Sequence, residues 1–470
     1  MRSRLQQIGL VFFGLVAGVL ISLNFSANAQ KEAAAPLPVE ELRTFADVFN
    51  AIKQGYVEPI EDKKLITHAV SGMLSNLDPH SAYLDADAFK DLQVSTQGEF
   101  GGLGIEVGME DGFVKVVAPI EDTPAFKAGV KAGDLIIKLD ETPVKGMTLN
   151  DAVKRMRGKP KTGITLTILR KGEPKPIVVT IVRDKIKVQS VKSKMIEPGF
   201  GYLRVTQFQE ETAADVVRHL DKLYKQDKEE KGEGLRGLVL DLRNDPGGLL
   251  HGAVGVSAAF LQPKAAVVST DGRTPDAKRQ YSAAPEDYLR GTREDFLKGL
   301  PPGAKTVPMV VIVNGGSASA SEIVAGALQD HKRAVILGTQ TFGKGSVQTI
   351  LPLSNNTAIK LTTARYYTPG GRSIQAKGIV PDVVVEETPN GDTRERVREA
   401  DLDRHLDNDR EKTPAPAEKP KAQPQGKAGK GTKAAEEEEA PKPPELASKS
   451  DYQLGQAVNL LKAWQIIQKK

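Results

Sequence analysis

Residues 317–323 read SASASEI and place three serines, alternating with alanines, directly after the apolar run MVVIVN and a Gly-Gly turn. This order predicts a strand, a sharp turn and a helix that begins at about Ala320. A serine at such a junction lies at the positive end of the helix dipole, which favours the oxyanion of acyl transfer. Serines before helices are usually N-caps, and the spacing alone does not choose a nucleophile among Ser317, Ser319 and Ser321.

A serine nucleophile requires a base, and histidine is the conventional one. His331 lies at the far end of the helix that the serines begin, roughly 15 Å away at 1.5 Å per residue, and is better explained as a helix cap. His251 follows the turn DPGG and stays a candidate base. We expect surface roles for the remaining histidines, which are His68, His80, His219 and His405.

Lysine is the alternative base, and TFGKGSVQ offers Lys344, which lies between two glycines after the apolar strand AVILG. A lysine accepts a proton only when neutral, so burial or a neighbouring positive charge must lower its pKa from about 10.4. Residues 338–345 also match the phosphate-binding pattern G-x4-G-K, but Gly345 replaces the Ser or Thr that holds magnesium. The segment that follows predicts strands where that motif needs a helix, so we reject a phosphate-binding loop.

The length and composition limit the class of protein that carries these residues. The 470 residues suffice for roughly three domain-sized units. The net charge of +5 is small for this length and gives no indication of nucleic-acid binding. The chain has no cysteine, which excludes disulfides, zinc–thiolate sites and cysteine nucleophiles.

The first 29 residues have the order of an export signal. Arg2 and Arg4 precede a long apolar stretch, and Ala-Asn-Ala follows it, with cleavage expected after Ala29. The apolar stretch is long for a signal peptide, so retention as a single anchor in the inner membrane is the alternative. In either case we expect the rest of the chain outside the cytoplasm, in the periplasm.

Changes of hydrophobic pattern divide the rest of the chain. Near-continuous apolar strands, each followed by a turn and a helix, predict an α/β core with a largely parallel sheet, while short strands before it predict an inserted β domain. A Lys/Pro/Ala/Glu-rich segment near the end is too poor in large apolar residues to fold. The expected boundaries are 37–95 for an amino-terminal helical region, 97–184 for the β domain, 185–395 for the core, 405–449 for a disordered linker and 450–470 for a terminal helix.

The β domain begins with GEFGGLGIEV and continues with AGVKAGDLIIKLD, a combination that resembles a PDZ domain. Successive backbone N–H groups in a glycine-rich loop beside a sheet edge suit the terminal carboxylate of a peptide. The resemblance implies that a peptide C-terminus adds as a strand beside this loop, with a helix lining the groove for its side chains. The implied binding residues are Gly102, Leu103, Gly104 and Ile105 in the loop and Leu149, Val153 and Met156 on the helix.

Four motifs, LVLDLRNDPGG, NGGSASASEIVAGAL, GTQTFGKGSVQ and YYTPGGRSIQAKGIVPDVVV, occur in this order after the PDZ-like insert. Together they resemble the carboxyl-terminal processing peptidases, serine endopeptidases with a Ser–Lys catalytic pair. By motif position the resemblance implies Ser319 as nucleophile, Lys344 as general base and Gln348 as the residue that orients the lysine. It implies an oxyanion site formed by the N–H of Ala320 and one from the DPGG turn, Gly247 or Gly248, with Gly247 favoured.

The resemblance also implies a function. It describes an exported endopeptidase that binds protein C-termini through its PDZ domain and cleaves by an acyl-enzyme mechanism, with neither metal nor cofactor. Expected partners are protein or peptide substrates with free C-termini, an adaptor or activator protein, and a second copy of the chain that docks through the terminal helices. Two alternatives stay open, an inactive PDZ scaffold and a Ser–His hydrolase that uses His251.

Overall fold

The computed structural model of the chain describes residues 37–120, 122–230, 232–291, 294–391, 396–410 and 446–468. The expected export signal, residues 1–29, lies outside the described residues, as does most of the expected linker. Within the described part of the chain, no helix is both long enough and apolar enough to cross a membrane. The chain divides into two compact units, Met1–Val70 and Ser71–Lys470.

The described part of the amino-terminal unit is helical, as the spacing of its apolar residues predicts. It contains α2 (Val39–Gly55) and the first part of α3 (Asp62–Ser75). Glu40 and Glu41 lie in the first turn of α2, where negative charge complements the helix dipole. No side chain of α2 is buried, so this helix forms no core of its own.

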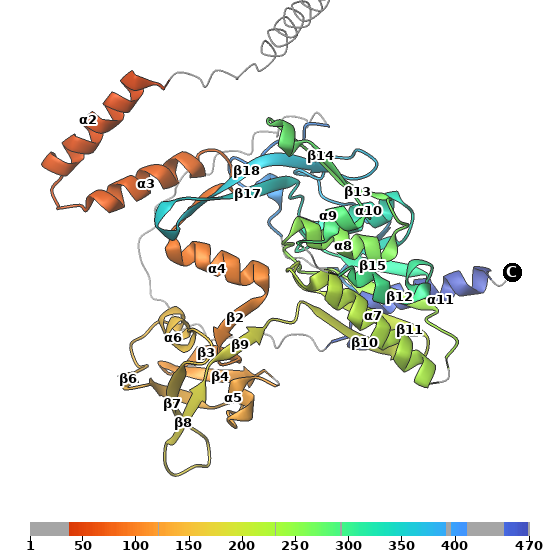
Figure 1. The fold of residues 1–470 in the computed structure, drawn as a ribbon. Helices are drawn as coiled ribbons and strands as arrows, with labels where there is room; N and C mark the ends of the chain where they lie inside the picture. The colour runs from red at the N-terminus through yellow and green to blue at the C-terminus, as the bar shows by residue number, and fades with distance from the viewer. Residues whose placement is uncertain are drawn as a thin grey trace, which may run out of the picture. The chain divides into compact units, whose positions relative to one another are not determined.

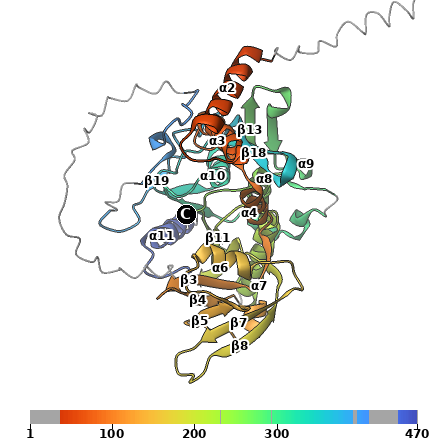
Figure 2. The same ribbon diagram turned by 90° about the vertical axis from the view of Figure 1, so that its left-hand side faces the viewer.

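The β domain is built on a sheet with the strand order β3-β4-β5-β7-β8, in which neighbouring strands are antiparallel. Its elements are β2 (Glu99–Gly102), β3 (Ile105–Glu110), β4 (Phe113–Pro119), α5 (Pro124–Lys127), β5 (Leu135–Leu139), β6 (Thr142–Pro143), α6 (Leu149–Met156), β7 (Gly163–Leu169), β8 (Ile177–Val182) and β9 (Asp184–Lys187). The pair β2 and β9 joins the two ends of the domain. Helix α6 lies beside β3 (Figure 2), which stands at one end of the strand order.

The core contains a sheet with the order β10-β11-β12-β15-β16-β19, in which β10 is antiparallel to its neighbour and the following pairs are parallel. Its strands and the helices that accompany them are β10 (Val191–Glu197), β11 (Phe200–Val205), α7 (Thr212–Glu229), β12 (Gly237–Asp241), α8 (Leu250–Phe260), α9 (Pro285–Tyr288), β15 (Met309–Val313), α10 (Ala320–Asp330), β16 (Val335–Gly338), β19 (Val383–Val384) and α11 (Tyr452–Gln468). Every residue of β12 and β15 is buried, as expected for central strands covered on both faces.

Different helices cover the two faces of this sheet (Figure 1), and its side chains alternate between them. Leu238 and Val311 point to the face covered by α7, α8 and α10. Val239 and Val310, their neighbours in sequence, point to the opposite face, where α11 packs with Leu454 and other apolar residues. The terminal helix therefore completes the core, although it follows a long low-complexity segment.

A second sheet of the core has the order β1-β18-β13-β14, with β17 paired to β18, and all these pairs are antiparallel. Its strands are β1 (Ala82–Leu84), β13 (Ala266–Gly272), β14 (Arg279–Ser282), β17 (Ser346–Pro352) and β18 (Ala358–Tyr367). The expected largely parallel sheet therefore describes only part of the core. A connection as short as that between β17 and β18 can join only antiparallel neighbours, so this hairpin departs from the expected parallel order.

Residues 396–410, here called the carboxyl-terminal strap, pack on the core after β19. The strap contains the short 3-10 helix Glu399–Asp401. Asn408 is buried, and its side-chain amide donates to the carbonyl of Gln375 (2.9 Å). The expected start of the linker at residue 405 is therefore too early, because residues 405–410 belong to the packed core.

Candidate active site

The residues SASASEI join β15 to α10. Ser319 is the N-cap residue of α10 and has φ 56° and ψ −111°. A positive φ is uncommon for a residue with a side chain, and such strain is typical of functional sites. This backbone conformation distinguishes Ser319 from an ordinary helix cap and supports a functional role for it.

Hydrogen bonding separates the three serines. Ser317 Oγ donates to the carbonyl of Leu242 (2.8 Å), and Ser321 Oγ donates to the carbonyl of Asp245 (2.9 Å). Both side chains are fully buried. Ser319, which is only partly buried, lines a cavity of about 510 Å³. The structure thus gives Ser317 and Ser321 roles in holding the turn and leaves Ser319 accessible to a substrate.

The cavity lies among the first turn of α10, the DPGG turn, β17 and the helix α4 (Ala86–Gln97). Its polar residues include Ser319, Lys344 and Gln348. A cleft with a few polar groups and apolar walls suits an extended peptide segment. The apolar side chains that line it are Phe89, Leu92, Leu249, Leu250, Ile323, Val347 and Ile350.

Tyr366 is a neighbour of the nucleophile candidate that the sequence analysis missed. Its hydroxyl lies 2.9 Å from Ser319 Oγ. Burial raises the pKa of Tyr366, so the phenol stays protonated at neutral pH. Tyr366 is the first residue of the motif YYTPGGRSIQ, but a tyrosine within a strand is usually part of the core, and the motif gave it no role. In the structure the Ser319 hydroxyl is therefore bonded to a neutral phenol.

Lys344 lies in the loop between β16 and β17 and lines the same cavity. Burial, together with repulsion from Lys360, lowers the pKa of Lys344 from 10.5 to about 8. These are the two causes that a neutral lysine requires. Among the described residues Lys344 Nζ has no hydrogen-bond partner, and either hydroxyl can be the donor between Ser319 and Tyr366. When Tyr366 donates to Ser319 Oγ, the Ser319 proton is free to move toward Lys344. Catalytic hydrogen bonds often form only when substrate is bound.

Gln348, the expected orienting residue, lies on β17 and lines the cavity. Its side-chain amide donates to Ser346 Oγ (3.0 Å) and Thr362 Oγ1 (3.3 Å). Within the described part of the chain, its side chain makes no hydrogen bond with Lys344. Gln348 is therefore near enough to share the cavity, while its amide is engaged with the neighbouring strands.

Glu322 joins the loop of the nucleophile candidate to that of the base candidate. Its Oε2 accepts the backbone N–H of Ser319 (2.8 Å) and that of Lys344 (2.9 Å). Its Oε1 accepts from Thr341 Oγ1 (2.5 Å) and from the N–H of Gly343 (2.7 Å). Glu322 is fully buried, and burial raises its pKa to about 7. The S-x-x-E spacing was a signal for this residue, since it is typical of a capping box.

The candidate oxyanion site lies where the DPGG turn meets α10. A Cβ built on Gly247 would lie 2.8 Å from the nitrogen of Ala320, so only glycine allows this approach. The N–H of Gly247, which the sequence analysis favoured, donates to Asp245 Oδ1 (2.8 Å). Among the described residues the N–H groups of Ala320 and Gly248 have no acceptor. The geometry therefore favours Gly248 over Gly247 as the second donor.

His251 lies outside this cavity. It is on α8, and its Nε2 lies 3.2 Å from Glu210. It lines a different hollow together with Tyr288 and Phe296. A Ser–His pair with Ser319 would therefore need another arrangement of the core.

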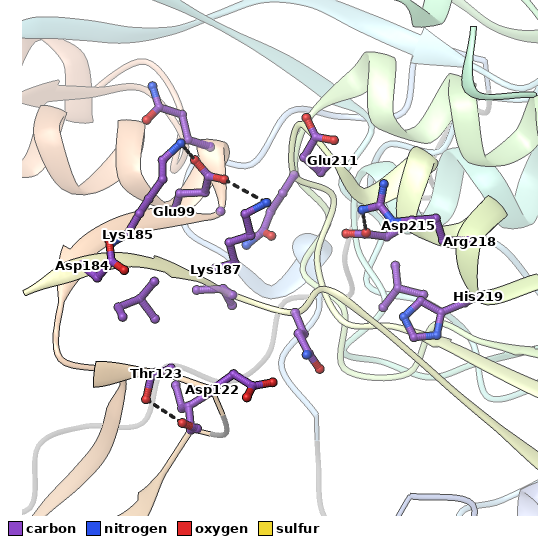
Figure 3. Close-up of a pocket in the computed structure, with 18 of the residues that line it drawn as sticks. Glu99, Asp122, Thr123, Asp184, Lys185, Lys187, Glu211, Asp215, Arg218 and His219 are labelled. Carbon is purple, nitrogen blue, oxygen red and sulfur yellow. Dashed lines mark hydrogen bonds and ion pairs between the residues drawn. The ribbon is translucent and has the colours of Figure 1, made fainter. Parts of the chain in front are cut away.

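A further cavity of about 410 Å³, drawn in Figure 3, is lined by charged residues, several of which form ion pairs. Glu99 lies between Lys185 and Lys187, and Asp215 pairs with Arg218. This cavity contains none of the predicted catalytic residues. The described residues also contain no cluster of three His, Asp or Glu side chains that could hold a metal ion.

Several of the predicted peptide-binding residues lie near one edge of the β domain, that of β3. Gly104 has φ 77°, and a Cβ there would collide with Thr123, so the loop before β3 needs glycine. Among the described strands, β3 pairs only with β4, which leaves its outer edge open to a further strand. Ile105, Leu149 and Val153 are partly buried and pack on the domain core beside this edge, whereas Met156 is buried within it.

Comparison with known proteins agrees with this geometry. Residues 199–385 match the model of peptidase family S41, residues 101–181 match the PDZ domain, and residues 21–88 match the N-terminal domain of the activating protease CtpB. The carboxy-terminal-processing protease of Bartonella bacilliformis is 50% identical over 80% of this chain and 82% of its own length. The carboxy-terminal processing protease CtpB of Bacillus subtilis is 33% identical over 80% of this chain and 75% of its own length.

A solved photosystem II D1 C-terminal processing protease is 31% identical and covers 73% of this chain and 93% of its own, with a TM-score of 0.39. The core with its serine and the peptide-binding β domain define a serine-type peptidase that carries a PDZ domain. The chain belongs to peptidase family S41, among the carboxyl-terminal processing peptidases. The family resemblance drawn from the four motifs is thereby confirmed.

Proposed function

We propose that the chain is an exported endopeptidase that binds protein C-termini in its PDZ groove and cleaves by a Ser319–Lys344 acyl-enzyme mechanism. One observation carries the assignment of the pair. Among the three serines of SASASE, Ser319 is the one that lines the cavity, and Lys344 lines the same cavity. Burial lowers the pKa of Lys344 to about 8. The order of basic, apolar and Ala-Asn-Ala segments in residues 1–29 supports export.

In this mechanism neutral Lys344 takes the proton of Ser319 Oγ. The alkoxide attacks the substrate carbonyl, and the N–H groups of Ala320 and Gly248 stabilise the tetrahedral oxyanion. Lys344 then gives its proton to the leaving amine, and the acyl-enzyme forms. Water, activated by the same lysine, attacks the ester, and Ser319 regains its proton as the second product leaves.

The PDZ groove contributes to cleavage by raising the local concentration of substrate, and it takes no part in the bond-breaking steps. A substrate whose terminal carboxylate is held by the loop before β3 keeps its upstream segment near Ser319, which raises the local concentration of cleavable bonds. The sites that are cut are therefore expected upstream of the bound terminus. Unfolded segments are favoured because an extended strand must enter the cavity.

The test is digestion of an unfolded protein, β-casein, with products identified by mass spectrometry. Ser319→Ala and Lys344→Ala should each abolish cleavage while circular dichroism shows an unchanged fold. Lys192→Ala, which removes an exposed lysine from β10, is the matched control and should keep full activity. A fully active Lys344→Ala enzyme would refute the Ser–Lys pair, and loss of activity in His251→Ala with an intact fold would support the histidine alternative.

A further inference from the structure

The carboxyl-terminal strap brings a buried carboxylate to the loop of the candidate base. Glu399 lies in the strap, beyond the residues that match the peptidase family model. Its side chain is fully buried. A buried carboxylate is costly unless hydrogen bonds compensate it, so its partners indicate what the position requires.

Two side chains hold the Glu399 carboxylate. His80 Nε2, from the turn before β1, lies 2.8 Å from Oε2 and 3.0 Å from Oε1. The side-chain amide of Gln375 donates to Oε1 (2.9 Å) and also to the carbonyl of Leu406 in the strap (3.0 Å). Because the NH₂ group of Gln375 donates to two residues of the strap, its amide oxygen points away from the strap.

That oxygen accepts the backbone N–H of Gly345, the residue after Lys344, at 3.0 Å. Glu399 also contacts the loop directly, because its own N–H donates to the carbonyl of Phe342 (3.1 Å). A Cβ on Gly345 would lie 2.3 Å from the nitrogen of Gln375, so the loop and this residue fit without room for movement. The strap therefore fixes the loop on one side of Lys344, while Glu322 fixes it on the other.

Charge provides a second route from Glu399 to Lys344. Burial and the positive charge of Lys360 on β18 lower the pKa of Lys344, while Glu399, Glu322 and Asp78 act in the opposite direction. Asp78 lies in the turn before β1, where it accepts hydrogen bonds from Ser81 and Thr362. Tyr366 on β18, which lines the same cavity, stays protonated because it is buried, and His80 is a further ionisable group in contact with Glu399.

We propose that Glu399 is a positioning residue for Lys344, which holds the base loop through Gln375 and places a negative charge against that loop. This inference rests on the proposed function, in which Lys344 is the base. The two contributions are separable. Glu399→Gln keeps the shape and an acceptor for Gln375 but removes the charge, whereas Gln375→Leu removes the hydrogen bond to Gly345 and leaves the charge in place.

The measurement is kcat/KM for β-casein as a function of pH for each variant. Activity rises with pH as Lys344 loses its proton, so removal of a nearby negative charge should move this acid limb to lower pH. We expect Glu399→Gln to shift the limb by several tenths of a pH unit. We expect Gln375→Leu to lower kcat/KM roughly tenfold across the range, because an unpaired buried N–H is costly. Asp403→Asn, an exposed carboxylate of the same strap, is the control and should change neither.

The outcomes are distinct. If Lys344→Ala is active in the same assay, the proposed function fails. If Lys344→Ala is inactive and the Glu399→Gln profile coincides with that of Asp403→Asn, the role of Glu399 alone is overturned. Loss of activity at all pH values with no movement of the limb would also overturn the charge contribution. If Glu399→Gln does not fold, Gln375→Leu provides the test. An unchanged kcat/KM in Gln375→Leu would refute the proposal that the strap positions the loop of Lys344.

Discussion

Replacement of Lys344 by methionine should make the protein more stable while it abolishes activity. Lys344 Nζ has no hydrogen-bond partner among the described residues, and burial opposes its charged form. Methionine has a similar length and fills the same space without a charge. Lys344→Met therefore removes an unfavourable charge from the folded state and leaves no polar partner unpaired.

The magnitude follows from the pKa of Lys344. The fall from 10.5 to about 8 corresponds to about 3 kcal/mol, at about 1.4 kcal/mol for each pH unit. Below pH 8 the lysine is protonated in both the folded and the unfolded chain, so the full cost is present at pH 7. Between about pH 8 and 10.5 the folded chain loses this proton first, and the cost declines as pH rises.

Thermal unfolding followed by circular dichroism at pH 7 and pH 10 tests this reasoning. For a core of this size, about 3 kcal/mol corresponds to a rise of roughly 6–12 °C in the melting temperature of the core at pH 7. The gain over the wild type should be much smaller at pH 10. Lys192→Met, at an exposed position of β10, should change the melting temperature little at either pH. The reasoning would be refuted if Lys344→Met were no more stable than the wild type at pH 7. It would also be refuted if the gain in melting temperature were the same at both pH values, because burial would then not disfavour a charged Lys344.

Two further predictions concern the loops and the PDZ groove. Glu322→Gln should lower kcat by roughly ten- to a hundredfold with little change in KM. The reason is that an amide cannot accept all four hydrogen bonds that hold the Ser319 and Lys344 loops. Steady-state kinetics test this prediction, and an unchanged kcat would contradict it. A peptide with an amidated C-terminus should bind at least about tenfold more weakly than the free acid, because the loop before β3 loses a charged acceptor. Fluorescence anisotropy with both peptides measures the difference, and equal affinities would argue against carboxylate recognition.

The sequence by itself determined the class of protein and the chemical candidates. Motif order singled out Ser319 and Lys344, and the glycine-rich loop with AGDLI indicated the PDZ domain. Local signals were sufficient there because strands, turns and helix starts depend on nearby residues. The same signals indicated helices α2, α6 and α11 and the buried strands β12 and β15.

Only the tertiary structure decided which groups meet. In the structure the hydroxyls of Ser317 and Ser321 donate hydrogen bonds to backbone carbonyls, and the N–H of Gly247 donates to Asp245. The hydroxyl of Tyr366 lies within hydrogen-bond distance of Ser319, the nucleophile candidate. The contacts of the three serines have no sequence signature, because each joins residues that are far apart in the chain, whereas the bond from Gly247 to Asp245 is local to the DPGG turn.

The same holds for the charges around Lys344. A lysine base must be neutral, and the sequence does not show which residues make it so. The charged residues that affect the pKa of Lys344 come from β18, α10, the strap and the turn before β1. Glu399 lies 55 residues after Lys344 and lies near it only because the strap returns across the core. A pKa depends on burial and on neighbouring charges in space, so the sequence could name the base, while the fold alone determines when that base is neutral.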